Sequence, residues 1–93
     1  MRHTKTIFAK DLTNTLLGNV DENELFSVVF VKKGNGKKRV MRAKYSSNDI
    51  QTDKQLILID TQIGQYRRVN TDTVKIVKTK SLDLKIKKPL YKI

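Results

Sequence analysis

The sequence predicts a mainly β domain, with a short N-terminal helix followed by five short strands. Three observations support this. Residues 25–31 are β-branched and aromatic, an Asn-Gly pair follows in a basic turn, and short strand-like segments then recur up to residue 79. Strands at this spacing indicate a small barrel or a strongly bent sheet. At 93 residues the chain has room for a single domain, residues 1–93, with one modest core.

Residues 4–17 are expected to form the helix. Phe8, Leu12 and Leu16 recur every four residues, which places them on one helical face. Gly18 follows and is a natural left-handed C-terminal stop. A polar connection at Asp21–Glu24 then leads into the β region.

The first two strands are expected to form a hairpin. Leu25–Val31 is apolar at nearly every position, as in a strand buried on both sides. Asn35-Gly36 is a strong turn pair because both residues tolerate positive φ. The strand at Arg39–Tyr45 would alternate, with one face made of Met41, Ala43 and Tyr45 and the other of Val40, Arg42 and Lys44.

Three more strands are predicted after a polar loop at residues 46–54. The third is central, a turn marked by Gly64 follows it, and a tight connection at residues 71–73 precedes the fifth; the three strands are Gln55–Asp60, Gln65–Asn70 and Val74–Thr79. The barrel, residues 25–79, is expected to close on Phe26, Val28, Phe30, Met41, Leu58, Val69 and Ile76. The basic tail, residues 81–93, could add an edge strand that Pro89 would end.

Charge is the strongest functional signal. Lys and Arg total 20 against 9 acidic residues, a formal net charge of +11, which favours polyanionic partners. The charge is also segregated: residues 32–44 hold seven basic residues and no acid, whereas residues 11–24 hold four acids and no base. No cysteine is present, and no apolar run approaches the roughly 20 residues that span a bilayer. Without a signal-peptide stretch, the chain is expected to stay in the cytoplasm where it is made.

Residues 28–77 carry a pattern shared with a known family. It consists of Val29-Phe30-Val31-Lys32-Lys33, a Gly-containing turn, Arg39-Val40-Met41, then Leu56-Ile57-Leu58-Ile59-Asp60 and Tyr66-Arg67-Arg68-Val69-Asn70-Thr71-Asp72-Thr73-Val74. This order resembles small phage-associated domains with a WYL-like, Sm-like SH3 β-barrel, although Ala43 stands where the family often has Cys. The resemblance implies a five-stranded barrel, a phage origin and the cytoplasm of an infected host. Because such barrels commonly contact nucleic acid or nucleotides, it also favours that ligand class.

The candidate binding residues fall in three places. The hairpin supplies Lys33, Lys37, Lys38, Arg39, Arg42 and Lys44, which could follow a phosphate backbone or merely protect a sheet edge from pairing. Tyr66 and Arg68 could stack a base and hold its phosphate; alternatively Tyr66 caps the core and Arg68 pairs with Asp60 or Asp72. Arg67 would point inward toward a carboxylate such as Asp72. The tail adds Lys85, Lys87 and Lys88, as a binding arm or a partly ordered terminus.

The sequence offers little for catalysis. His3 is the only histidine and lies near the terminus, and Gly34-Asn35-Gly36-Lys37 lacks the spacing of a phosphate-binding P-loop. We therefore expect no enzyme activity, no cofactor and no metal. The expected function is binding of DNA or RNA through phosphates with little base specificity. The alternative is an inhibitor or host-takeover factor that docks the same basic face on an acidic host protein, because carboxylates and phosphates select the same lysines. A small-nucleotide pocket is a third possibility, for which the sequence locates no concave site.

Overall fold

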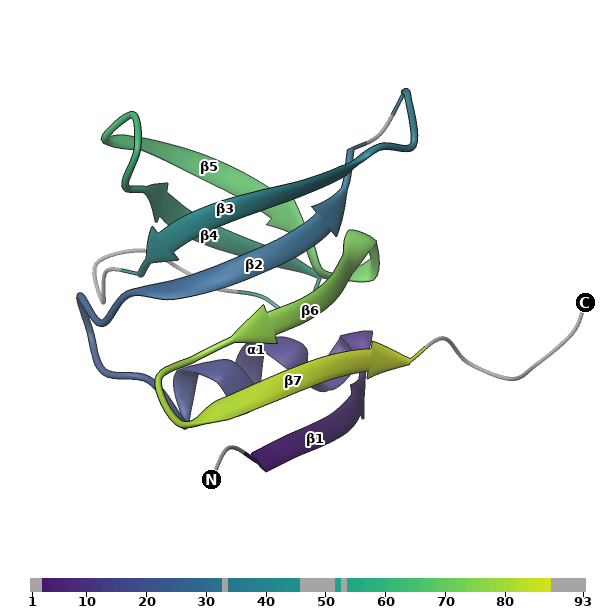
Figure 1. Ribbon diagram of the computed structural model, residues 1–93, viewed down its shortest axis with the longest axis vertical. Helices are drawn as coiled ribbons and strands as arrows, with labels where there is room; N and C mark the ends of the chain where they lie inside the picture. Colours follow the sequence, from purple (N-terminus) through teal and green to yellow (C-terminus); the bar gives the residue numbers. More distant parts are fainter. Residues whose placement is uncertain (1–2, 33, 46–51, 53, 88–93) are drawn as a thin grey trace, which may run out of the picture.

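The computed structural model describes residues 3–32, 34–45, 52 and 54–87. Seven strands form one mixed sheet in the order β1-β7-β6-β2-β3-β4-β5 (Figure 1). The elements along the chain are β1 (His3–Phe8), α1 (Ala9–Leu17), β2 (Phe26–Val31), β3 (Lys38–Lys44), β4 (Gln55–Asp60), β5 (Gln65–Asn70), the 3-10 helix η1 (Thr71–Thr73), β6 (Val74–Lys78) and β7 (Leu82–Lys87). The mainly β prediction is confirmed.

The sheet is open and does not form the expected five-stranded barrel. β6 pairs with β2 on one side and with β7 on the other, so both of its edges are occupied. No edge of β6 is left for β5, which remains at one border of the sheet while β1 forms the other. β1, which the sequence predicted as part of the helix, and β7, which it offered as an edge strand, therefore extend the sheet where a barrel would have closed.

The predicted helix at residues 4–17 is wrong in its first half. Residues His3–Phe8 form β1, which runs parallel to β7 from His3 opposite Leu82 to Phe8 opposite Lys87. β-branched Thr4, Thr6 and Ile7 favour an extended strand, and β7 offers this segment an unpaired edge. The helix begins at Ala9, and Leu12 and Leu16 are fully buried as expected.

Gly18 ends the helix without the expected left-handed conformation. Its φ is −78°, and its N–H donates to the Asn14 carbonyl 3.1 Å away. A Cβ at this position would lie 3.3 Å from that carbonyl oxygen, a tight approach. Glycine is therefore favoured here because the helix end is closely packed, and not because the backbone is left-handed.

The β2–β3 hairpin is confirmed, with one correction at its turn. Positive φ occurs at Gly34 (99°) and Gly36 (67°) but not at Asn35. Asn35 instead accepts the Lys37 N–H through Oδ1 at 2.9 Å, the kind of side-chain contact that favours Asn in turns. The Lys32 N–H donates to the Lys37 carbonyl at 2.8 Å and closes the hairpin.

One predicted core residue, Ile76, lies only half buried because β6 contains a bulge. Val29 of β2 pairs with Ile76, but the next residue, Phe30, pairs with Val74, so Lys75 is an extra residue in β6. The bulge places Val74 and Val77 toward the core in place of Ile76. Simple alternation along β6 could not reveal this.

The core lies between α1 and one face of the curved sheet. Helix α1 contacts β1, β7 and η1, and in Figure 1 it lies behind β7. Phe30 is only partly buried at the border of the core. The buried apolar residues are Ile7, Leu12, Leu16, Val20, Phe26, Val28, Met41, Ala43, Leu56, Leu58, Val69, Val74, Val77 and Leu84.

The expected tail strand is present, but as an interior strand. β7 lies between β6 and β1, because β1 pairs with the edge that β7 would otherwise expose. The predicted central strand, β4, lies instead next to the sheet border formed by β5. Pro89, expected to end the tail strand, lies outside the described residues.

We predict that Leu84→Ala lowers the free energy of unfolding by about 2–5 kcal/mol, because Leu84 is fully buried in β7. Chemical denaturation would measure the change. The matched control is Lys85→Ala, at the next and exposed position, which should change stability by less than about 0.5 kcal/mol. Equal effects of the two substitutions would contradict the placement of β7.

Candidate functional site

The sheet face opposite the core, here called the outer face, gathers cations from four strands. Alternation from the buried positions and the strand registers together assign its members. Among the described strand positions, Asp83 is the one acid on this face. The cations of the outer face are Lys38, Arg42, Lys44, Arg68, Lys78, Lys85 and Lys87.

An apolar row crosses the outer face between these cations. Val29 lies between Val40 of β3 and Ile76 of β6 in the strand registers. Val40 is 66% exposed, which is unusual for a large aliphatic side chain at the middle of a strand. The row two residues along holds Arg42 and Lys78 on either side of Ser27. Apolar and cationic rows therefore adjoin one another across three strands.

Where β1 pairs with β7, a cation contacts an aromatic ring. Phe8 pairs with Lys87 in the parallel register, and the Lys87 ammonium lies 4.6 Å from the centre of the Phe8 ring. A cation–π contact at an exposed site contributes about 0.5–1 kcal/mol. It holds Lys87 at the border of the outer face.

Tyr66 and Arg68 also lie on the outer face. They pair with Ile59 and Ile57 of β4, and Tyr66 is 59% exposed. The expectation that Tyr66 caps the core is therefore wrong. Arg68 faces away from Asp60, which is buried on the core side of the sheet. Both side chains are available to a ligand on the outer face.

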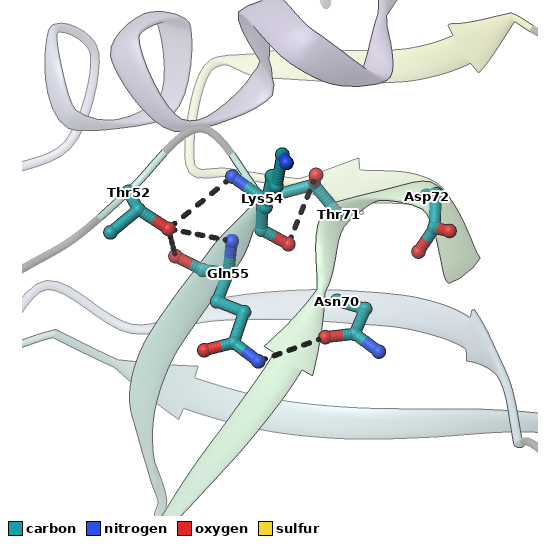
Figure 2. Close-up of a pocket in the computed structure, with 6 residues that line it drawn as sticks. All are labelled: Thr52, Lys54, Gln55, Asn70, Thr71 and Asp72. Atoms are coloured by element: carbon teal, nitrogen blue, oxygen red, sulfur yellow. Dashed lines mark hydrogen bonds between the residues drawn. The ribbon is translucent and has the colours of Figure 1, made fainter.

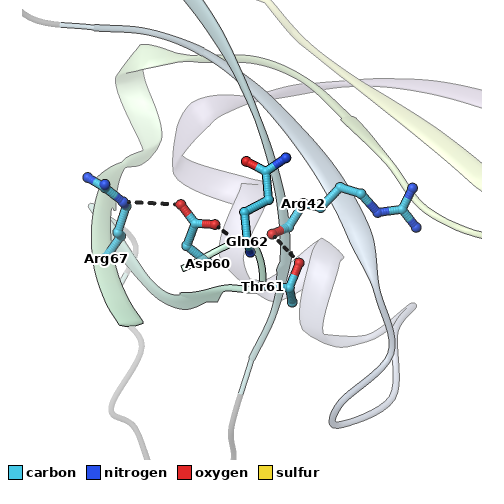
Figure 3. Close-up of polar contacts among 5 residues, drawn as sticks. All are labelled: Arg42, Asp60, Thr61, Gln62 and Arg67. Carbon is cyan, nitrogen blue, oxygen red and sulfur yellow. Dashed lines mark hydrogen bonds and ion pairs between the residues drawn. The ribbon is translucent and has the colours of Figure 1, made fainter. Parts of the chain in front are cut away.

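Arg67 points to the core side, as expected, but its partner is Asp60 and not Asp72. Arg67 Nε donates to Asp60 Oδ2 at 3.2 Å, and Figure 3 shows the pair beside the β4–β5 turn. Asp60 Oδ1 accepts the Gln62 N–H at 3.0 Å. The two strands are paired neighbours, so the inward-facing Asp60 and Arg67 meet across them. Both oxygens of the buried carboxylate are thus satisfied.

A cleft of about 230 Å³ opens beside this ion pair, on the core side of the sheet. Arg39 lines it because Arg39 lies on the same strand face as the buried Met41, opposite to Arg42. The remaining lining residues are Phe30, Lys32, Val40, Met41, Asp60, Gln62 and Arg67. The sequence-predicted site therefore divides into two surfaces, one on each side of β3.

The remaining predicted residues belong to neither surface. Lys37 is exposed in the hairpin turn, and Lys33 and Lys88 lie outside the described residues. Sequence reasoning missed Lys32 and Lys78 as site residues. Alternation from Phe30 could have placed Lys32 on the core side, whereas the position of Lys78 depends on the bulge in β6.

A larger hollow of about 540 Å³ lies where β4 begins and β5 ends (Figure 2). Its polar groups bond to one another: Gln55 Nε2 donates to Asn70 Oδ1 at 3.2 Å, and the Thr71 N–H donates to the Lys54 carbonyl at 2.9 Å. Thr52 Oγ1 accepts the Gln55 N–H at 3.0 Å. These contacts join the two strand ends, which indicates a structural connection and not a ligand site.

Comparisons of the chain with protein-family models, with curated proteins and with solved structures found no match. The family resemblance seen in the sequence therefore stays a prediction. The described residues contain no group of three or more acidic, histidine or cysteine side chains that could hold a metal ion. None of the described helices is long and apolar enough to cross a membrane.

We predict that Arg67→Ala lowers stability by about 1–3 kcal/mol, because it removes the charged partner of a buried carboxylate. Arg68→Ala is the matched control: it removes the same side chain from the next residue, on the outer face, and should change little. Thermal and chemical denaturation of the two variants would decide. A larger loss in the Arg68 variant would contradict the assigned strand faces.

Proposed function

We propose that the protein binds nucleic acid through the outer face, chiefly by phosphate contacts and with little base specificity. The observation that carries this proposal is the gathering of seven cations from four strands around one acid on a face that the helix leaves uncovered. Concentrating like charges costs self-repulsion, which a polyanion would relieve. Phosphate contacts position a nucleic acid without reading its sequence.

The outer face suits single strands better than duplexes. Exposed Tyr66 beside Arg68 offers a ring for base stacking and a guanidinium for the adjoining phosphate. The apolar row around Val40 offers further contact area for unstacked bases. A duplex hides its base faces and could use only the cations.

The family resemblance adds weaker support. The five predicted strands are neighbours in the order β6-β2-β3-β4-β5, with η1 between β5 and β6, although the sheet they belong to is open and is not a closed barrel. Sm-like and WYL-like barrels commonly contact nucleic acid, and the resemblance also implies a phage origin. This part of the proposal rests on analogy of fold and not on the site.

An acidic host protein is the second candidate partner. The observation that favours it is the exposure of Val40 (66%) among the cations of β3, since exposed aliphatic side chains rimmed by charge also occur at protein interfaces. Its carboxylates would replace the phosphates.

The test is the salt dependence of binding to a single-stranded oligonucleotide. If about five of the cations contact phosphates, the slope of log affinity against log salt should be about −3.5. The triple variant Lys38→Ala, Arg42→Ala, Lys78→Ala should reduce its magnitude by about 2. Fluorescence anisotropy at several salt concentrations would measure both, with mixed-sequence oligonucleotides testing base specificity.

A second triple variant, Lys5→Ala, Lys10→Ala, Lys54→Ala, is the control. It removes the same charge from exposed positions outside the outer face and should leave the slope unchanged. Equal reductions in both variants would show only a net-charge effect and would contradict a defined site. Absence of nucleic-acid binding at low salt, together with nuclease-resistant capture of one acidic protein, would favour the second candidate.

A further inference from the structure

The cleft on the core side of the sheet has an unbalanced charge. Lys32, Arg39 and Arg67 contribute three positive charges and Asp60 one negative charge, so its lining carries a formal charge of +2. Asp60 is the only acid in the lining, and it is already paired with Arg67 at 3.2 Å. In the part of the chain that the structure describes, no ion pair engages Lys32 or Arg39.

Arg67 retains donors for a ligand. Its Nε–H is used by Asp60, but a guanidinium carries four further N–H groups on its two terminal nitrogens. The contact with Asp60 uses only the Nε edge of the guanidinium, so the terminal nitrogens are left for a ligand.

We propose that this cleft binds a phosphate monoester. Such a group carries a charge near −2 at neutral pH, which matches the +2 of the lining. Arginine forks bind phosphate oxygens in pairs, and two arginines and a lysine line one cleft here. Phe30 and Met41 form an apolar wall of the cleft. This wall concentrates the electric field of the cations, and it can also contact the organic part of the ester.

Two sources could supply this chemistry: the terminal phosphate of a nucleic-acid strand, or a free nucleotide. The proposal does not depend on the outer face, because Arg39 and Arg42 project to opposite sides of β3. The two sites can therefore be tested separately.

The experiment is titration of the labelled protein with adenosine monophosphate, and with adenosine as the uncharged comparison, followed by NMR. Amide signals around the cleft should shift with the nucleotide and not with the nucleoside. Arg39→Gln should weaken nucleotide binding about tenfold, because it removes a charged donor. Lys10→Gln, which removes one exposed charge outside both surfaces, is the control and should leave this affinity unchanged.

Asp60→Asn gives a second readout that a merely structural site would not produce. Asparagine keeps an oxygen for the Gln62 N–H but removes the negative charge, so phosphate affinity should rise by about threefold or more. Thermal denaturation would verify that the variant is folded. Weaker binding by the folded Asp60→Asn variant, or equal losses in the Arg39 and Lys10 variants, would overturn the proposal.

A short oligonucleotide with and without a terminal phosphate distinguishes the sources, at salt high enough to suppress outer-face contacts. A tighter complex with the phosphorylated strand that Arg39→Gln abolishes assigns the site to strand ends. Binding of the mononucleotide alone assigns it to a free nucleotide. Binding of neither overturns the proposal. The triple variant of the outer face should retain nucleotide binding in the cleft. Loss of nucleic-acid binding at the outer face can therefore be distinguished from absence of the cleft site.

Discussion

The packing of α1 against one side of the sheet is the interaction on which the rest of the structure depends. A helix of nine residues buries Leu12 and Leu16 completely, and it reaches β1, β7 and η1. One helix of this length cannot cover both faces of a seven-stranded sheet. The opposite face must therefore meet solvent or a partner, and its composition becomes a functional matter.

The pairing of β1 with β7 completes this arrangement. Because β1 immediately precedes α1, its parallel pairing with β7 holds the start of the helix beside the end of β7. The same pairing makes β7 an interior strand and brings Lys85 and Lys87 onto the outer face with the cations of β3. Cations of β3 and cations of β6 and β7, distant in sequence, thus contribute to one surface.

The arginines show how the strand face decides the role of a residue. Arg67 and Arg68 are adjacent in sequence, yet one pairs with buried Asp60 while the other lies in the open beside Tyr66. Arg39 and Arg42 are separated in the same way by β3. Residues close together in one strand therefore contribute to two surfaces of different character: a broad face with apolar rows, and a confined cleft with one acid.

The sequence by itself determined the β class, the β2–β3 hairpin and the strands β4, β5 and β6, because β-branched runs and glycine turns are local signals. It also placed Lys38, Arg42 and Lys44 together, since alternation is fixed by the pleat. Only the tertiary structure decided that residues 3–8 are a strand, because their state depends on an edge of β7 that lies far along the chain. The tertiary structure also decided that the sheet stays open, that Lys75 forms a bulge in β6, and that Asp60 is the partner of Arg67. Each of these depends on which strands become neighbours, and local residue patterns do not encode long-range pairing.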